Sequence, residues 1–313
     1  MASVKLAEVL RGKVVESVHY GSIVVVDHHG EIITALGDPH YFTYFRSAAK
    51  PLQALAVLEG GAADYYDFSL KDIALFCGSH TGEKEHQSGV QNILEKIDLD
   101  ASFLKCDLAN PCSGKHAGML ALAKYWDLSL ADYYLPTHLV QQEMKGLVAD
   151  FAGLKPEELK EGIDGCGVPV WALPLRNMAR AYAQLVNLEV SAGQLVQKAM
   201  QSQPFYVGGS KSFDTALLSA LSEKIIAKFG AEGVYCLGVP ERRWGIALKI
   251  ADGNVRALPV VVLSVLKQLA LLDNAAQVKM VDWLEPKLKN SCGEIVGLIR
   301  PVFKLPKGWS KGV

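Results

Sequence analysis

A serine and a lysine lie one helical turn apart in the segment FRSAAKPLQ, residues 45–53. Side chains three positions apart share a face of a helix, so Ser47 and Lys50 can reach each other. A serine becomes a nucleophile when a base removes its proton, and a lysine can be that base once burial or a neighbouring cation lowers its pKa. The amide groups of a helix N-terminus also stabilise a developing oxyanion. The spacing predicts nucleophilic catalysis; the alternative is that Ser47 caps the helix and Lys50 lies in solvent.

Two further segments place a serine in a turn and a lysine on a strand. In FCGSHTGEKEH, nearby glycines let the backbone turn sharply and expose Ser79, although an ordinary capping serine is the alternative. In GIALKIADG, alternation puts Lys249 on a face of small side chains, as expected beside a cleft, although a solvated edge-strand lysine is commoner. This order is that of the S-x-x-K, S-D-N and K-T-G elements of penicillin-binding proteins and class A β-lactamases. Because SHT and KIADG replace SDN and KTG, we do not expect a β-lactam substrate.

Cysteines next to glycines form a candidate metal site in NPCSGKHAGM and GIDGCGVPVW. Cys112 and Cys166 with one nitrogen ligand make a zinc donor set that leaves a fourth position for water or substrate. By chemistry alone His116 is the better nitrogen ligand, because Lys115 coordinates only after it loses a proton. Asp164 can orient a ligand or hold the ammonium group of a substrate. The alternative is two buried structural thiols.

The composition excludes several classes of protein. Of 313 residues, 50% are hydrophobic and 21% are charged, and 32 Lys and Arg against 33 Asp and Glu give a net charge of -1. A nucleic-acid-binding protein needs a basic surface, which this balance does not provide. The N-terminal segment lacks the apolar core of an export signal, no run reaches the roughly 18 apolar residues of a membrane span, and six scattered cysteines indicate reduced thiols. We therefore predict a cytoplasmic protein without nucleic-acid or membrane partners.

The elements that position these residues follow from hydrophobic periodicity. Residues 20–36 predict a β-hairpin around the turn DHHG, and three later segments predict further strands: 233–239, 244–253 and 293–299. Apolar positions three and four apart predict helices at 49–60, 82–97, 114–126, 138–153, 173–187 and 212–230. The length of the apolar segment 255–272 favours a buried helix.

Strands at both chain ends and helices between them predict an α+β fold. We expect an antiparallel sheet built from both chain ends, flanked by helices, with an inserted helical lobe, as in β-lactamases and penicillin-binding proteins. The chain would then be one catalytic unit, residues 1–313, with a sheet lobe (1–45 plus 231–313) and a mainly helical lobe (46–230).

Six motifs in series resemble those of the rhizobial-type L-asparaginases, the third structural class of asparaginases. They are FRSAAKPLQ, CGSHTGEKEH, NPCSGKHAGM, DGCGVPVWALPL, GGS…FDTALL and GIALKIADGNVRA, in the family's order from about residue 15 to 270. The resemblance implies the fold of serine β-lactamases and penicillin-binding proteins, a homodimer, and hydrolysis of the side-chain amide of L-asparagine to L-aspartate and ammonia.

Carried over residue by residue, the resemblance implies two Ser-Lys pairs, Ser47 with Lys50 and Ser79 with Lys249. We expect a serine to attack the amide carbonyl and release ammonia, and water to cleave the resulting β-aspartyl ester. Ser47 is the first candidate for the nucleophile by its spacing, and Ser79 with Lys249 is the second.

The resemblance also implies one Zn²⁺ per chain, held by Cys112, Lys115 and Cys166. Lys115 therefore replaces His116 as the expected nitrogen ligand, and His116 becomes a neighbour of the site. We expect this zinc to position the substrate and to affect the chemistry only indirectly.

Arg46, His80 and Asp164 are the expected substrate-binding residues. Arg46 and Asp164 match positions near the family's active site, where Arg46 would help lower the pKa of Lys50 and Asp164 would bind the α-amino group. Two alternatives stay open: a β-lactamase or D-Ala peptidase-like hydrolase, and a non-catalytic binding protein stabilised by zinc.

Overall fold

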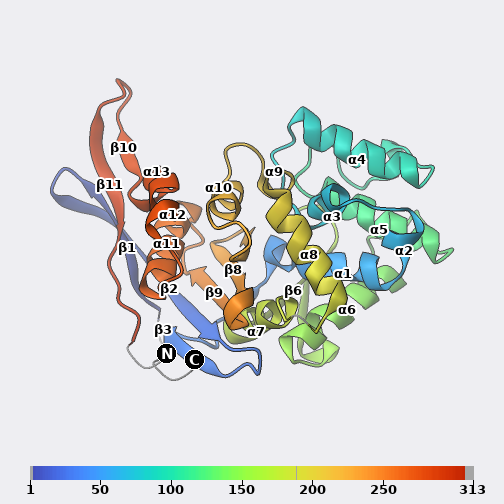
Figure 1. Cartoon of the computed structure of the whole chain (residues 1–313), viewed down its shortest axis with the longest axis horizontal. Coiled ribbons are helices and arrows are strands. Elements are labelled where there is room, and N and C mark those ends of the chain that lie inside the picture. Colours follow the sequence, from blue (N-terminus) through green and yellow to red (C-terminus); the bar gives the residue numbers. More distant parts are fainter. Residues whose placement is uncertain (1–2, 188, 307–313) are drawn as a thin grey trace.

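The computed structural model describes residues 3–187 and 189–306 as an assembly of strands and helices (Figure 1). The strands are β1 (Val4–Arg11), β2 (Val14–Val26), β3 (Ile32–Leu36), β4 (Phe42–Tyr44), β5 (Lys160–Ile163), β6 (Pro169–Pro174), β7 (Ile226–Gly230), β8 (Val234–Val239), β9 (Trp244–Ile250), β10 (Lys287–Lys289) and β11 (Ile295–Pro301). The α-helices are α1 (Lys50–Glu59), α2 (Ala62–Tyr65), α3 (Leu70–Cys77), α4 (Lys84–Lys96), α5 (Ser113–Tyr125), α6 (Leu139–Ala152), α7 (Leu175–Leu185), α8 (Ser191–Ser202), α9 (Pro204–Gly208), α10 (Phe213–Ala220), α11 (Leu258–Gln268), α12 (Asn274–Lys279) and α13 (Val281–Leu284). Short 3₁₀ helices are η1 (Arg46–Ala49), η2 (Ala101–Phe103), η3 (Pro156–Glu158), η4 (Pro240–Arg242) and η5 (Val255–Ala257).

An antiparallel sheet organises the described part of the chain. Eight strands form it in the order β10-β11-β1-β2-β9-β8-β7, and β3 pairs with the second half of β2. The strands come from both ends of the sequence, which confirms the predicted α+β class. The three-stranded sheet β4-β6-β5 is separate. The predicted hairpin, the later strands and the helices are all found, except at the end of the predicted helix 212–230.

The segment 212–230 is a helix followed by a strand, which corrects the prediction of one long helix. Helix α10 ends at Ala220, and Glu223 has the left-handed φ of 67° that turns the chain away. Strand β7 follows and is almost entirely buried on both faces, so its apolar run carries no alternation that would distinguish it from a helix. The division into two lobes stays a prediction, but β7, assigned there to the helical lobe, is the last strand of the sheet.

Helices pack on the sheet and hold in place the strands that carry the polar side chains of the site. Helix α7 packs on β9, where a Cβ on Gly245 would lie only 1.7 Å from the Ala179 carbonyl oxygen. Helix α11 packs against β1 and β11, and the mainly helical part lies beyond the other end of the sheet (Figure 1). Hydroxyl caps start the helices beside the site: Ser69 for α3 and Ser212 for α10.

In the described ranges, every helix is too short or too polar to span a membrane.

Candidate active site

The short helix η1 lies directly on the edge strand β7 because Gly230 has no side chain. A Cβ at Gly230 would be 2.9 Å from the carbonyl oxygen of Phe45 and 3.3 Å from the amide nitrogen of Ala48. Alternation along the strand puts Lys228 on the same face as Gly230. The segment that carries Ser47 therefore rests beside a lysine of the sheet.

Ser47 begins its helical turn after a residue in a left-handed conformation. Arg46 has φ 53°, a conformation that costs about 1–3 kcal/mol in a residue with a side chain and persists where the surroundings enforce it. No side chain caps η1 or α1, so Ser47 is not the N-cap that the alternative required. Its half-buried hydroxyl has no hydrogen-bond partner among the described residues, which leaves it free to react.

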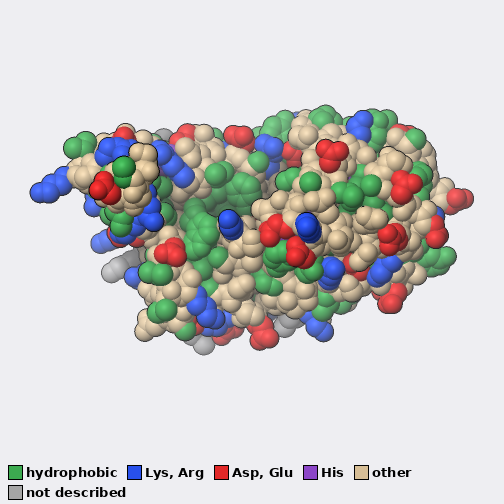
Figure 2. Space-filling model, turned by 90° about the horizontal axis from the view of Figure 1, so that it is seen from above, with side chains coloured by type: hydrophobic (Ala, Val, Ile, Leu, Met, Phe, Trp, Pro, Cys, Tyr) green, Lys and Arg blue, Asp and Glu red, His purple; other side chains and the backbone are tan. Residues whose placement is uncertain are grey.

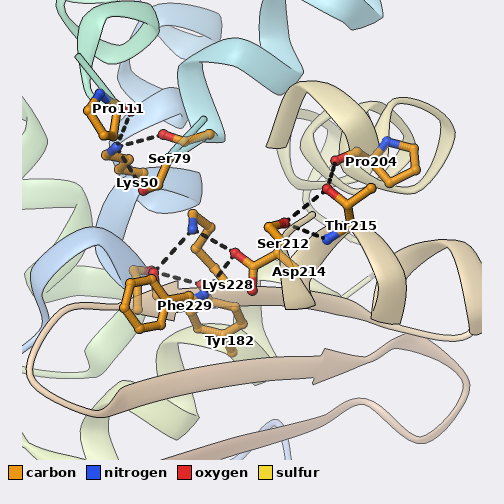
Figure 3. Close-up of polar contacts among 12 residues, drawn as sticks. Lys50, Ser79, Pro111, Tyr182, Pro204, Ser212, Asp214, Thr215, Lys228 and Phe229 are labelled. Atoms are coloured by element: carbon orange, nitrogen blue, oxygen red, sulfur yellow. Dashed lines mark hydrogen bonds and ion pairs between the residues drawn. The ribbon is translucent and has the colours of Figure 1, made fainter. Parts of the chain in front are cut away.

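Lys50 is buried, with 1% of its surface exposed, and not in solvent as the alternative required. Its Nζ lies 2.6 Å from the carbonyl oxygen of Gly78, 3.0 Å from that of Pro111 and 2.9 Å from Ser79 Oγ (Figure 3). Burial lowers the pKa of Lys50, the charge of Cys112 opposes this, and the nearby Lys115 reinforces it. The three N–H groups of the ammonium can donate to these three oxygens, and loss of one proton frees a lone pair that can act as a base.

Ser79 follows α3 in a loop that a buried histidine holds in place. The Ser79 amide donates to the Val207 carbonyl at 2.8 Å. His80 is fully buried; its Nδ1 accepts from the Gly82 amide, so its Nε2 donates to Ser113 Oγ at 2.9 Å. Burial lowers the pKa of His80 to about 3, which keeps the ring neutral. The predicted substrate contact of His80 is corrected, because its ring is enclosed and both nitrogens are used to position the loop.

The predicted Ser79–Lys249 pair is also wrong. Lys249 is buried on β9, and its ammonium donates to the carbonyl oxygens of Glu232 and Ile250, the second at 2.7 Å. Strands β8 and β7 separate β9 from η1, so the lysine reaches the β7–β8 turn instead of the serines. Within the described ranges no hydrogen bond joins Lys249 to Ser79, whose amine partner is Lys50.

Lys228 and Asp214 are site residues that the sequence reasoning missed. Lys228 Nζ lies 2.7 Å from Asp214 Oδ2, both side chains are buried, and the lysine's charge helps lower the pKa of Lys50 (Figure 3). The prediction of one helix over 212–230 places Asp214 and Lys228 on the same element, whereas the structure places them on α10 and β7. The available signal was AKFG, in which a lysine interrupts an apolar run and a glycine follows two positions later on the same face of a strand.

Tyr182 of α7 is a further residue that the sequence reasoning did not single out. Its hydroxyl donates to the Ala48 carbonyl at 2.8 Å and so ties η1 to the helix that covers the sheet (Figure 3). Burial raises its pKa, so the hydroxyl stays protonated and keeps this bond. A single tyrosine in an amphipathic helix gives no sequence signal for such a contact.

The predicted metal ligands converge. Cys112 and Cys166 are buried and both thiols are free, and Lys115 Nζ lies 3.4 Å from Cys166 Sγ. A hydrogen bond from Cys166 and the charges of Lys50 and Lys115 lower the pKa of Cys112 to about 4, and the Cys166 pKa is raised because it donates that bond. The cluster is therefore a thiolate, a thiol and an ammonium, because burial opposes the charge of Lys115 but the neighbouring charges, that of Cys112 foremost, together outweigh burial and raise the pKa of Lys115.

His116 lies beside this cluster without joining it. Its Nδ1 is 2.7 Å from the Tyr133 hydroxyl, in agreement with its expected place as a neighbour. In the described part of the chain, no three side chains of His, Cys, Asp or Glu gather as a metal site. The Nζ of Lys115, the nitrogen ligand that the resemblance implies, lies 3.4 Å from Cys166 Sγ.

Arg46 and Asp164 form an ion pair next to the cluster. Arg46 Nε and Nη2 lie 3.1 and 2.9 Å from Asp164 Oδ1. Burial opposes ionisation of Asp164, but the charges of Lys115 and Arg46 and the Gly165 amide outweigh it and lower its pKa. A partly buried pair of opposite charges beside Ser47 suits the two charged ends of an amino acid.

Ser79 and Lys228 also line a cleft of about 570 Å³ that continues past α10 to α11 and α13. Trp283 and Ile299, from the C-terminal region to which the sequence assigned no role, are in its wall. Ser79 and Lys228 thus border open space on this side of the site.

Comparison with known proteins identifies a matching protein family. The family model described as L-asparaginase II matches residues 7–111 and 105–301. No curated protein sequence matches. Among solved structures, "Mglu in its native form in the presence of 4.3M NaCl" is 15% identical, covering 81% of this chain and 62% of that one with a TM-score of 0.52. "Mglu in its L-glutamate binding form" is 13% identical and covers 81% and 61% with a TM-score of 0.51.

A β-lactamase from Mycobacterium bovis is also similar, with 15% identity over 79% of this chain and 94% of that one and a TM-score of 0.46. The chain spans about three fifths of the Mglu structures, and at such identities the likeness to them shows the fold alone. The family model covers most of the chain, and it favours an amidohydrolase over a non-catalytic binding protein. The chain belongs to the L-asparaginase II family.

Proposed function

We propose that the protein hydrolyses the side-chain amide of L-asparagine to L-aspartate and ammonia by acyl transfer. The observation that carries this proposal is the buried amine of Lys50, three positions after Ser47 in the sequence, which is held by two carbonyl oxygens and donates to the Ser79 hydroxyl. Burial lowers the pKa of Lys50 and so favours the neutral amine, which is the form that can accept a proton. The family assignment supports the choice of amide chemistry.

In the proposed first step, Lys50 takes the proton of Ser47 as the Ser47 oxygen bonds to the amide carbon. Lys50 then passes a proton to Ser79, whose hydroxyl gives its own proton to the leaving nitrogen as the carbon–nitrogen bond breaks. Ammonia leaves and a β-aspartyl ester remains on Ser47. Water, deprotonated by Lys50, attacks this ester and restores the serine.

The ion pair beside Ser47 suits recognition of the amino-acid end. Asp164 would bind the α-amino group of asparagine, and Arg46 would bind its α-carboxylate while keeping Asp164 ionised. Both residues come from segments that pack next to the nucleophile, so the substrate's amide would reach Ser47 with its charged end held.

The cluster of Cys112, Lys115 and Cys166 fits a zinc ion, because two sulfurs and one nitrogen already converge there. When bound, zinc would supply a Lewis-acidic position for a polar group of the substrate. Binding must release the protons of Cys166 and Lys115, so we expect zinc affinity to rise with pH. The zinc ion, the homodimer and the cytoplasmic location stay predictions.

Removal of the metal tests its role. We expect a chelator to raise KM for L-asparagine by a larger factor than it lowers kcat, because the ion would position the substrate rather than take protons. The measurement is steady-state kinetics on one sample before and after chelation, with zinc content determined on both. Loss of kcat with an unchanged KM would contradict this role.

The function itself is tested by ammonia release from L-asparagine and L-glutamine by the pure protein. We expect release from L-asparagine, and none from the Ser47→Ala/Ser79→Ala double variant. Of the single variants, Ser47→Ala should lose more activity, because Ser79 only relays a proton. Undiminished release by the double variant, or no release by the native protein, would overturn the proposal.

A further inference from the structure

The cleft that begins at Ser79 is larger and more apolar than asparagine requires. It measures about 570 Å³, within the range of roughly 300 to 1,000 Å³ that is typical of pockets for drug-sized ligands. Beyond Ser79 and Lys228 its walls carry large apolar side chains, chiefly Phe213, Phe229, Leu258, Pro259, Trp283 and Ile299. Figure 2 shows hydrophobic side chains gathered at a hollow left of centre, over the region of α10 and α13 in Figure 1.

The charges of the cleft do not suit the ends of a free amino acid. Asp214 and Lys228 are paired with each other at 2.7 Å, and the other charged residues of the wall, Arg256 and Asp282, are exposed to solvent. A buried ammonium or carboxylate needs a charged partner, and an apolar wall offers none. The pair that we assign to the amino-acid end, Arg46 with Asp164, is not part of this wall.

The position of Ser79 sets which part of a substrate faces the cleft. Ser79 lines the cleft and, in the proposed function on which this inference rests, protonates the leaving nitrogen. A group bonded to that nitrogen would therefore extend from Ser79 along the apolar wall. We propose that the enzyme also hydrolyses β-aspartyl amides whose nitrogen carries an apolar group, and that Trp283 is the residue that selects for this group.

The chemistry balances in the same way as for asparagine. The Ser47 oxygen–carbon bond forms and the carbon–nitrogen bond breaks, and the amine leaves with the proton that Lys50 has passed through Ser79. Water then hydrolyses the ester to L-aspartate. Burying the apolar group against Trp283 contributes binding energy without changing any of these steps.

The test compares three substrates: L-asparagine, L-aspartic acid β-methylamide and L-aspartic acid β-anilide. Trp283→Ala is expected to lower kcat/KM for the anilide about tenfold, the effect of losing the apolar contact of one ring. The variant should leave the other two substrates within about twofold, since neither reaches Trp283, and Trp283→Phe should restore part of the anilide rate. The matched control Trp244→Ala removes a half-buried tryptophan outside the cleft and should leave all three unchanged.

Three other outcomes would each contradict a different part of the proposal. Cleavage of L-asparagine without cleavage of the anilide would overturn the inference and leave the proposed function standing. An equal loss on all three substrates in Trp283→Ala would give the residue a structural role and overturn its role in selection. Cleavage of none of them by the native protein would overturn the proposed function and this inference with it.

Discussion

Lys50→Met is expected to lower kcat for L-asparagine by about 10³-fold, within the range of roughly 10² to 10⁴ that a general base contributes. Methionine fills a similar volume in the buried site, so the main loss is the amine that takes the proton of Ser47 and reaches Ser79. The measurement is steady-state ammonia release, with a thermal unfolding curve to show that the variant is folded.

Lys249→Met is the matched control, because it removes another buried lysine, whose ammonium donates to the carbonyl oxygens of Glu232 in the β7–β8 turn and of Ile250 at the end of β9. It should keep kcat within a few-fold of the native value. If Lys249→Met were as inactive as Lys50→Met, the pairing of Ser79 with Lys50 would not describe the catalytic state.

The pH profile gives a second readout of the same base. Lys50 works as a base only when neutral, so kcat/KM must rise with pH as Lys50 loses its proton. Burial lowers its pKa, which places this rise below the ordinary value for lysine of about 10.4. The rising limb should be absent from the residual activity of Lys50→Met; its persistence there would assign the limb to another group.

Much of the site was predictable because it depends on short spacings. Ser47 and Lys50 are three positions apart across the junction of η1 and α1, and Cys112 directly precedes α5, which carries Lys115, so each pair is close in space because it is close in the sequence. Lys115 Nζ lies 3.4 Å from Cys166 Sγ, although that thiol comes from a turn 51 positions away in the sequence. Here the glycines around the cysteines were the signal, since they permit tight turns next to a ligand.

The sheet lysine was harder to predict, because it depends on strand order. Lys228 and Lys249 are on strands of similar composition, and both sequences end in a glycine turn. Only the pairing of β7 at the edge, with β9 two strands further in, decides which one faces η1. That order arises from packing between segments far apart in the chain, and a local sequence pattern does not contain this information.

Asp214→Asn is expected to lower the free energy of unfolding by about 3 to 5 kcal/mol, the cost of leaving one charge of a buried pair without its partner. Lys228 has 0% of its side chain exposed, so water does not replace the lost carboxylate. Asp214 also accepts from the Phe229 amide, which adds to the loss. The measurement is denaturant unfolding of both proteins under the same conditions.

The double variant Asp214→Asn/Lys228→Met separates stability from chemistry. Replacing a buried ion pair by uncharged side chains is often close to neutral, so we expect most of the lost stability to return. The activity of the double variant should stay below that of the native protein, because the charge of Lys228 helps lower the pKa of Lys50. Without that charge the pKa of Lys50 rises, and the rising limb of kcat/KM moves to higher pH. A double variant as unstable as Asp214→Asn would show that Asp214 acts through contacts other than its pair with Lys228, and an unmoved limb would remove Lys228 from the electrostatics of the base.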